Sequence, residues 1–330
     1  MMRLGIVAVK VVLAFALVYV IVNFVGKANI IGAVSGANRV DCLCAFAFLV
    51  LAVAINALRW RVAMTALHAP INVRIALLGT FEAVFFQQIL PSGVGGDISR
   101  SVRAFDGGAA FGKSVIGVLI DRANGLLFVA FTLIAARFFS VSAILGTRIF
   151  SILFSVSLIV VAGALAAIAL GLVKIDGLFR QRVRAVKALI DDYSRCMRSP
   201  LYLARILVLL TFSNLAYIDS FRYCASALGR ELSWWDGAIV VQGMSLAAII
   251  PLSIGGWGLR EGAALLLFAP LGVEGAPAVS ISILFGLLMT SVGVIGAIIW
   301  LSQSYRRLEK FTFGRRSSPP SGLVADEADA

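Results

Sequence analysis

Two stretches of the chain share one pattern of proline, glycine and arginine, P-x-x-x-G-G-x-x-x-R. The first stretch reads "LPSGVGGDISR" and the second, 160 residues later, reads "IPLSIGGWGLR". The pattern residues are Pro91, Gly95, Gly96 and Arg100 in the first copy and Pro251, Gly255, Gly256 and Arg260 in the second. Proline lacks the N–H and glycine adopts backbone conformations that other residues avoid, so each copy is expected to end one helix and begin another.

An arginine just after such a break lies near a helix N-terminus, where exposed N–H groups already favour anions. Its planar guanidinium matches a phosphate or a carboxylate, and the glycines allow close approach of a headgroup. Each motif therefore predicts a binding site for an anionic lipid headgroup. An arginine that only reaches to the membrane interface as an anchor is the alternative.

Carboxylates accompany both motifs. Glu261 follows Arg260 directly, so on a helix the two side chains point about 100° apart. Glu261 is therefore expected to pair with another cation or to tune the site by protonation. Asp97 occupies the matching turn of the first motif, where helix capping is the simpler interpretation.

Further charged residues interrupt apolar segments, where charges are costly and are by default functional candidates. This expected intramembrane polar pathway consists of Glu82, Asp121, Arg122, Asp219 and Arg222. Asp219 and Arg222 have the spacing to bridge on one helix face, so a purely structural ion pair is the alternative for them. Asp121 and Arg122 are expected to contact the polar segment that follows the first break.

The composition identifies the elements that must position these residues as membrane helices. Of 330 residues, 60% are hydrophobic and only 14% are charged, against about 25% charged residues in soluble domains. The net charge of +12 sits in short loops and a tail, which indicates membrane topology and anionic lipid rather than nucleic acid. A single histidine and scattered free cysteines exclude a histidine-based metal site. No metalloprotease, hydrolase or nucleotide-binding motif occurs, so we assign no catalytic residue and expect no cofactor.

Six apolar segments have the length of a membrane span, near 4–26, 41–58, 115–137, 149–173, 203–225 and 278–302. The first is too long for a signal peptide core and is expected to be retained. Two shorter stretches, 75–90 and 237–250, lead into the motifs. We therefore expect an all-α polytopic membrane protein with six full transmembrane helices and two re-entrant helical hairpins; ordinary spans that end at a loop are the alternative.

Positive charges favour the hairpins. With both hairpins returning to their own side, the cytoplasmic segments hold 20 Lys and Arg residues and the outer loops hold 5; a single full span at the first motif gives 18 and 7. Both termini are then cytoplasmic, and the halves 1–137 and 138–305 become inverted repeats, followed by a disordered cytoplasmic tail at 306–330. Glu82 and Gln242 lie at matching positions, nine residues before each proline. The basic segment 174–205 predicts an amphipathic helix on the inner leaflet, or a solvated loop.

Three segments together, "LPSGVGGDISR", "IDRANGLL" at 120–127 and "PLSIGGWGLREGAA", resemble the lysylphosphatidylglycerol synthase transmembrane-region family. These are flippase-like integral membrane proteins, and they include the flippase half of the multiple peptide resistance factor. The resemblance covers about residues 5–305 and implies a lipid translocator fold. The positions that match the family's pattern are Pro91, Gly95, Gly96, Arg100, Asp121, Arg122, Pro251, Gly255, Gly256, Arg260 and Glu261. Gln88 departs from it, because the family often has asparagine there. The soluble aminoacyl-transferring domain of the fused members has no counterpart, so we expect no synthesis of aminoacylated lipid.

The leading hypothesis is a lipid flippase of a bacterial-type inner membrane that binds an anionic lipid headgroup between the two hairpins. An intramembrane transferase acting on a polyprenyl-phosphate or hopanoid lipid is the second, with Glu82, Glu261 and Asp121 as acid and base candidates. A non-catalytic partner of a lipid-synthesis complex is the third. The expected partners are membrane lipids, with a homo-oligomer or lipid-synthesis enzymes as further candidates.

Overall fold

The computed structural model describes residues 35–89, 94–170, 184–249 and 256–313, and all regular elements in these ranges are helices. The long helices are α3 (Arg39–Ala66), α6 (Phe111–Phe139), α7 (Arg148–Leu170), α10 (Pro200–Ala227) and α13 (Ala276–Phe313). The shorter helices are α4 (Val73–Ile89), α5 (Val94–Asp106), α9 (Arg184–Met197), α11 (Trp234–Ile249) and α12 (Leu259–Phe268), with 3-10 turns η1 (Ala143–Gly146) and η2 (Ala269–Leu271).

The five long helices are long and apolar enough to cross a membrane. They confirm the segments expected near 41–58, 115–137, 149–173, 203–225 and 278–302, whereas the span expected at 4–26 lies outside the described residues. Two helices are longer than expected. Helix α3 continues to Ala66 because Arg59 is buried against another helix and so does not mark a loop. Helix α13 continues to Phe313 through a segment without proline or glycine, so residues 306–313 of the expected tail are helical.

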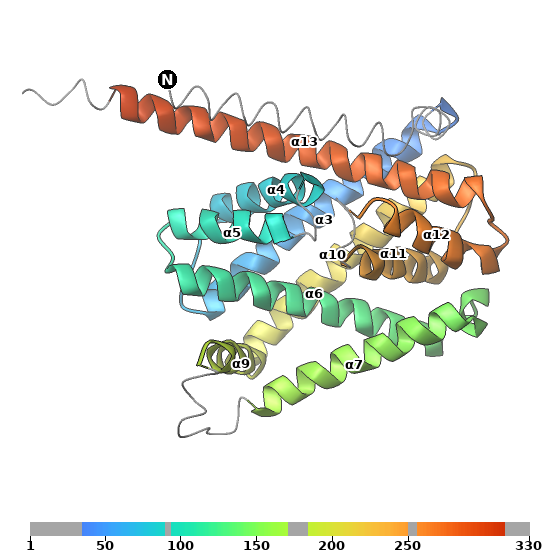
Figure 1. The fold of residues 1–330 in the computed structure, drawn as a ribbon, viewed down its shortest axis with the longest axis horizontal. Helices are drawn as coiled ribbons and strands as arrows, with labels where there is room; N and C mark the ends of the chain where they lie inside the picture. Colours follow the sequence, from blue (N-terminus) through green and yellow to red (C-terminus); the bar gives the residue numbers. More distant parts are fainter. Residues whose placement is uncertain (1–34, 90–93, 171–183, 250–255, 314–330) are drawn as a thin grey trace, which may run out of the picture.

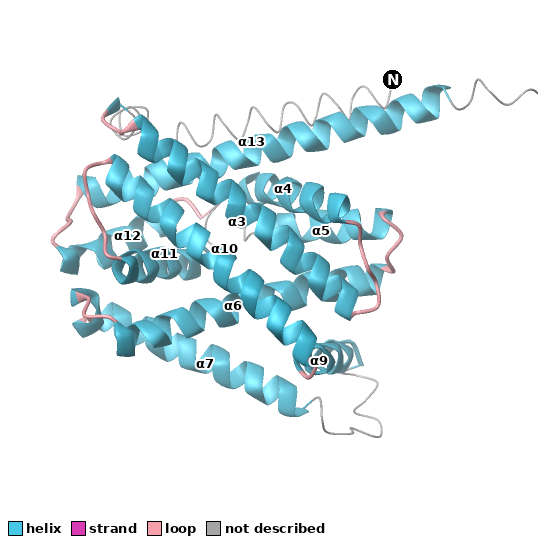
Figure 2. Cartoon of the chain, turned by 180° about the vertical axis from the view of Figure 1, so that it is seen from behind, coloured by secondary structure: helices cyan, strands magenta, loops and turns pink. Residues whose placement is uncertain are grey.

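Helices α3 and α10 cross near the centre of the molecule and pack closely along each other. Figure 1 shows the pair α4 and α5 toward one end of this crossing, and the pair α11 and α12 toward the other. Helix α13 passes over both pairs and contacts α4 and α12. Each motif therefore lies between two short antiparallel helices, and the outer ends of the two pairs point in opposite directions (Figures 1 and 2).

Close backbone contact joins α13 to the first pair of short helices. A Cβ atom at Gly293 would lie 3.5 Å from the Cα of Phe85, and one at Gly296 would lie 2.7 Å from the carbonyl carbon of Phe81. Small residues at such positions let membrane helices approach each other without side chains between them. The two glycines therefore explain how α13 packs directly on α4.

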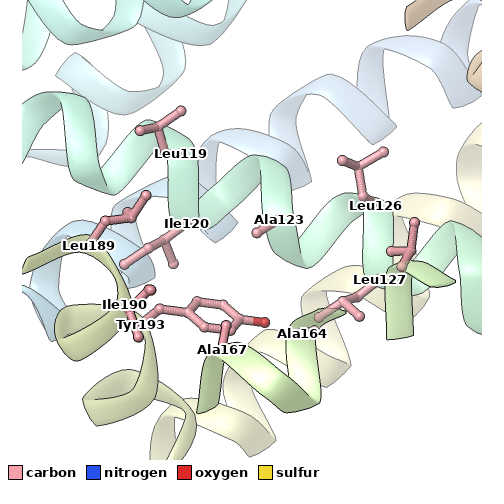
Figure 3. Close-up of a pocket in the computed structure, with 11 residues that line it drawn as sticks. Leu119, Ile120, Ala123, Leu126, Leu127, Ala164, Ala167, Leu189, Ile190 and Tyr193 are labelled. Atoms are coloured by element: carbon pink, nitrogen blue, oxygen red, sulfur yellow. The ribbon is translucent and has the colours of Figure 1, made fainter. Parts of the chain in front are cut away.

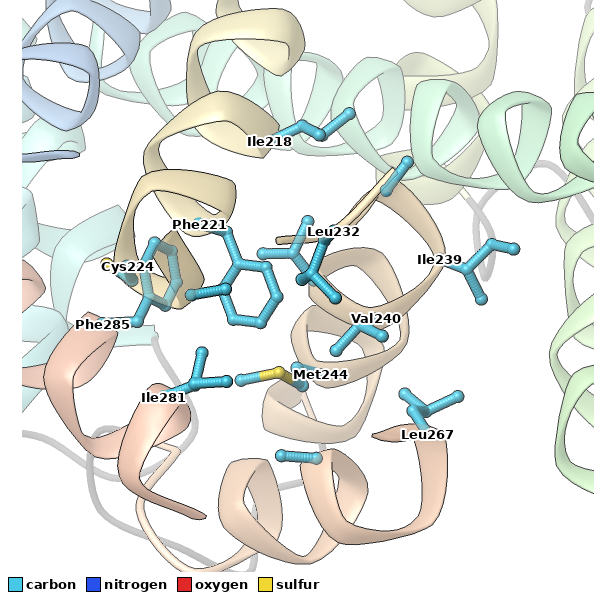
Figure 4. Packing of buried hydrophobic residues seen from close by; sticks show 14 of the residues in the cluster. Ile218, Phe221, Cys224, Leu232, Ile239, Val240, Met244, Leu267, Ile281 and Phe285 are labelled. Atoms are coloured by element: carbon cyan, nitrogen blue, oxygen red, sulfur yellow. The ribbon is translucent and has the colours of Figure 1, made fainter. Parts of the chain in front are cut away.

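The largest apolar cluster surrounds α11 and α12 (Figure 4). Phe221 of α10 packs edge-on against Phe285 of α13, with ring centroids 5.3 Å apart. Met244 of α11 and Leu267 of α12 are buried in the same cluster. The second pair of short helices is thus held mainly by aromatic and aliphatic packing.

Contacts in the two halves correspond. Arg61 Nε donates to the carbonyl of Ile71 at 3.2 Å, and Arg222 Nε donates to the carbonyl of Leu232 at 3.1 Å. Each bond links a long helix to the strap before the next short helix, and the two bonds are related by 161 positions. The helix contacts follow the same relation, since α3 with α4 and α5 with α6 have counterparts in α10 with α11 and α12 with α13. The division into repeats at 137 and 138 stays a prediction.

Candidate functional site

The first break brings two helices into close contact at its glycines. Gly95 and Gly96 are buried in the first turn of α5. A Cβ atom at Gly96 would lie 2.7 Å from the carbonyl oxygen of Ala83 on α4, which is too close for any side chain. Glycine at this position therefore allows α5 to fold back along α4, and this contact fixes where Arg100 lies. Pro91 lies outside the described residues.

Arg100 is buried, with 6% of its surface exposed. Its guanidinium donates to Asp121 of α6 at 2.7 Å and to Asp97 on its own helix at 3.0 Å. The Arg100 Cζ also lies 5.5 Å from the centre of the Trp60 ring on α3. The predicted headgroup residue is thus held by two carboxylates and an aromatic face.

Asp121 joins a second arginine to this network. Its carboxylate accepts from Arg59 Nε at 2.6 Å and from Arg59 Nη2 at 3.2 Å, a bidentate contact from α3. Arg122, beside it on α6, forms an ion pair with Asp97. The expected contact of Asp121 and Arg122 with the polar segment is therefore confirmed. The charged cluster of Arg59, Asp97, Arg100, Asp121 and Arg122 has three cations and two carboxylates, so its formal charge is +1.

Glu82 belongs to a neighbouring ion pair. It is buried on α4, and its carboxylate lies 3.2 Å from the Arg103 guanidinium of α5. Arg103 also reaches Gln303 near the end of α13. A buried carboxylate of this kind is stabilised by its partner, so Glu82 ties the first pair of short helices together and to α13. Asp97 is not an N-cap residue, because α5 already begins at Val94.

The second break is built from local contacts. Gly256 and Gly258 have φ angles of 80° and 86°, which favour glycine, and a Cβ atom at Gly256 would lie 2.9 Å from the Cβ of Ala248. Gly256 is buried. Pro251 and Gly255 lie outside the described residues. The turn directs Arg260, the second residue of α12, into the protein interior.

Arg260 is also buried, with 6% of its surface exposed. Its guanidinium donates to Glu261 at 3.0 Å and lies 4.5 Å from the centre of the Trp257 ring. Glu261 further accepts from Ser282 of α13 at 3.0 Å and from the backbone N–H of Gly258. The expectation that Glu261 pairs with a different cation is wrong, because its side chain bends back along the helix start, caps it and meets Arg260 on the way.

The remaining polar residues lie apart from both arginines. Asp219 and Arg222 form the expected bridge on α10, 2.9 Å apart and each partly exposed. Gln242 is buried and donates to Asn214 at 3.0 Å, so it does not repeat the ion pair of Glu82. Among the described residues no group of three metal-ligating side chains occurs.

Sequence reasoning missed Arg59, Trp60, Trp257 and Ser282 as partners of the two motif arginines. A signal was present for Ser282: "IDRANGLL" at 120–127 and "ISILFGLL" at 281–288 share isoleucine at the start and Gly-Leu-Leu at the end. In this register Asp121 corresponds to Ser282, and Ser101 corresponds to Glu261. The carboxylate and the hydroxyl therefore exchange positions between the two breaks.

Several buried polar atoms near the breaks have no hydrogen-bond partner among the described residues. Three are N–H donors, the Nε of Arg100 and the indole nitrogens of Trp60 and Trp257. Two are acceptors, the side-chain oxygens of Asn56 and Gln88. Buried polar groups are normally satisfied, so the regions around the arginines have a chemical capacity for a ligand with acceptor and donor groups.

Comparison with known proteins agrees with this organisation. The model of the family described as "Lysylphosphatidylglycerol synthase TM region" matches residues 7–297, which include both breaks and all of the charged clusters described above. No curated protein matches the chain.

Proposed function

The chain belongs to the lysylphosphatidylglycerol synthase transmembrane-region family, and from this premise we propose that it is a lipid flippase of the inner membrane of a bacterial-type cell. Both termini face the cytoplasm in this proposal, as the positive charges favour. The lipid's anionic headgroup binds between the two breaks, and its tails stay in the surrounding bilayer.

One observation carries the proposal: each break places a buried arginine against a tryptophan at the tip of a pair of short helices. Arg100 lies over Trp60, and Arg260 lies over Trp257. Paired broken helices at matching places of two halves are typical of transporter binding sites. Broken backbone at membrane depth persists only where protein or a polar cavity surrounds it, and the pairs enter from opposite faces in this proposal.

Charge determines how a phosphate binds at the first break. Asp121 is almost fully buried, with 1% of its side chain exposed, and it is shared by Arg59 and Arg100. Asp97 is 16% exposed, and its partner Arg122 is 34% exposed. An incoming phosphate therefore meets Arg122 first and replaces Asp97 beside Arg100, while Asp121 stays in place. The +1 charge of the cluster favours this exchange.

At the second break the arginine is balanced by one carboxylate, with no excess charge. Glu261 holds Arg260, Ser282 and the Gly258 N–H at once. A headgroup binds there only if it substitutes for Glu261 or adds a donor to it, as an amino-bearing or hydroxyl-bearing headgroup does. We infer that a translocated lipid carries both an oxyanion and a donor group, and that rocking of the two halves exposes it to each leaflet in turn.

Reconstitution into vesicles with a fluorescent phospholipid tests the proposal. We expect Arg100→Gln, and the double variant Arg260→Gln/Glu261→Gln, to lower the rate of lipid transfer between leaflets by about tenfold or more, the equivalent of one charge-assisted hydrogen bond. Arg230→Gln is the control, because Arg230 is an exposed residue before α11. Equal transfer by the wild type and both site variants would refute the assigned role.

The two alternatives give different results in the same preparation. An intramembrane transferase forms a product from a lipid-linked donor without moving the fluorescent lipid. A non-catalytic partner does neither and retains its function when both arginines are replaced. Glu82 and Asp121, the acid and base candidates of a transferase, are each engaged with arginine, so no observation favours the enzyme.

A further inference from the structure

A cavity of about 260 Å³ lies between α6, α7 and α9, well away from the two arginine breaks (Figure 3). Its walls are leucine, isoleucine, valine and alanine side chains. Leu119, Ala123 and Leu127 come from α6, whereas Ala164 and Ala167 come from α7. The single polar group drawn in the cavity is the phenol of Tyr193, on α9.

The Tyr193 hydroxyl is a buried group without a hydrogen-bond partner among the described residues. The residue is 6% exposed, and Figure 3 shows its hydroxyl directed into the pocket beside the alanines of α7. Burial raises the pKa of Tyr193 to about 12, so the hydroxyl stays protonated and is available as a donor. An unpaired buried donor costs stability, so this site suits an occupant with an acceptor.

The position of the cavity indicates which molecules reach it. Helix α7 is the most lipid-like surface of the molecule, since only 6% of its most apolar window is buried. Helix α9 is amphipathic: Asp192 is buried and pairs with Lys113 at 2.7 Å, whereas Arg195 is exposed. The cavity thus opens among lipid-exposed helices, directly beneath a charged helix that lies at a membrane surface.

We propose that this cavity binds one acyl chain of a membrane glycerolipid, with the ester carbonyl accepting a hydrogen bond from the Tyr193 hydroxyl. Ester groups lie at the boundary between headgroups and hydrocarbon, which is the level of α9. The volume is below the range of about 300–1,000 Å³ of sites that enclose a whole small molecule. It therefore holds part of one chain, and the remainder of the lipid stays in the bilayer.

This site does not depend on the transport proposal, because the cavity and the two breaks share no residue. A lipid held here stabilises the contact of α7 and α9 with α6 whether or not the protein moves lipids. The test is therefore a binding measurement and needs no transport assay.

Photolabelling tests the site directly. The full chain is placed in phosphatidylcholine vesicles that contain a phosphatidylcholine with a diazirine in one acyl chain, and labelled peptides are identified by mass spectrometry. We expect label on α6, α7 and α9 at the cavity. Ala164→Phe fills the cavity and should reduce this label about fivefold or more. Ala162→Phe, on the exposed side of α7, is the matched control and should leave it unchanged.

A second comparison isolates the hydrogen bond. Tyr193→Phe keeps the ring and removes the hydroxyl, and it should lower labelling by the ester lipid about three- to tenfold. Labelling by a diether analogue, which lacks the carbonyl, should be weak in the wild type and unchanged by Tyr193→Phe. Equal labelling of the wild type by ester and ether lipids, or label that survives Ala164→Phe, would overturn the proposal.

Discussion

The two breaks hold the same residue, a buried arginine, in opposite ways. At the first break the main carboxylate, Asp121, comes from a neighbouring long helix, and three helices meet in one ionic cluster. At the second break the carboxylate, Glu261, is the next residue along the chain, and Ser282 of the neighbouring helix supplies only a hydroxyl.

The difference extends beyond the carboxylates. In the register that relates the halves, Arg59 and Trp60 of α3 correspond to Ser220 and Phe221 of α10. Phe221 lies in the apolar cluster around α11 and α12 (Figure 4), whereas Trp60 lies beside Arg100. The first pair of short helices is thus anchored by charge and the second by packing. One arrangement of helices supports two solutions to burying a guanidinium.

The largest expected effect comes from removing the shared carboxylate of the first break. Asp121→Asn leaves Arg59 and Arg100 buried without their main counter-charge, which should cost about 3–5 kcal/mol of stability. Thermal unfolding of the purified protein in detergent measures it. Asp219→Asn breaks a partly exposed pair and should cost about 1 kcal/mol or less. Equal losses in the two variants would show that the cluster does not anchor the first pair.

At the second break the loss should be smaller. Glu261→Gln keeps the size of the side chain but weakens hydrogen bonds to Arg260, which should cost about 1.5–3 kcal/mol. The exposed Glu231, changed to glutamine, is the control. Unfolding in the same detergent compares the two.

An exchange of residues sharpens this result. Glu261→Ser/Ser282→Asp moves the carboxylate to the position that Asp121 holds in the first half. The double variant should be more stable than Glu261→Ser alone, with a coupling of about 1–2 kcal/mol in a double-mutant cycle. A coupling of zero would mean that the two halves are not related in this register.

Two glycines provide a matched pair of the next size. A Cβ atom at Gly286 would lie 2.7 Å from Arg260 Cζ, whereas one at Gly125 would lie 3.6 Å from Arg59 Nη2, an ordinary contact. Gly286→Ala should therefore displace Arg260 and cost about 1–3 kcal/mol. Gly125→Ala should be nearly neutral, within about 1 kcal/mol of the wild type. Comparable melting temperatures for both variants would contradict the packing.

The smallest effect concerns the aromatic faces. Arg260 lies closer to its tryptophan ring, at 4.5 Å, than Arg100 does, at 5.5 Å. The coupling between Arg260→Gln and Trp257→Phe should be about 1 kcal/mol, and that between Arg100→Gln and Trp60→Phe about 0.5 kcal/mol. The cycle removes the separate cost of a smaller ring, and the opposite order would reverse this part of the comparison.

Much of the architecture follows from residue pattern alone. The apolar runs predicted the five long helices, because membrane spans have a nearly constant length. Proline and glycine placed the two breaks between short helices, and the polar character of the segment after the first break pointed to Asp121 and Arg122 as its partners.

The partners of Arg260 were less accessible. A helix diagram separates adjacent residues by about 100°, and it therefore argued against the Arg260 and Glu261 contact. The pair forms because long side chains bend, and because Glu261 is drawn to the free N–H of Gly258 at the start of α12.

The sequence by itself determined that this chain is a membrane protein, where its helices break and that an arginine follows each break, because hydrophobicity and backbone conformation are local properties. Only the tertiary structure decided which charge each arginine meets. Arg59 and Asp121 are 62 residues apart and are joined by the packing of α3 on α6. The exchange of carboxylate and hydroxyl between Asp121 and Ser282 gains its meaning only when the helices that carry them are placed beside the two breaks.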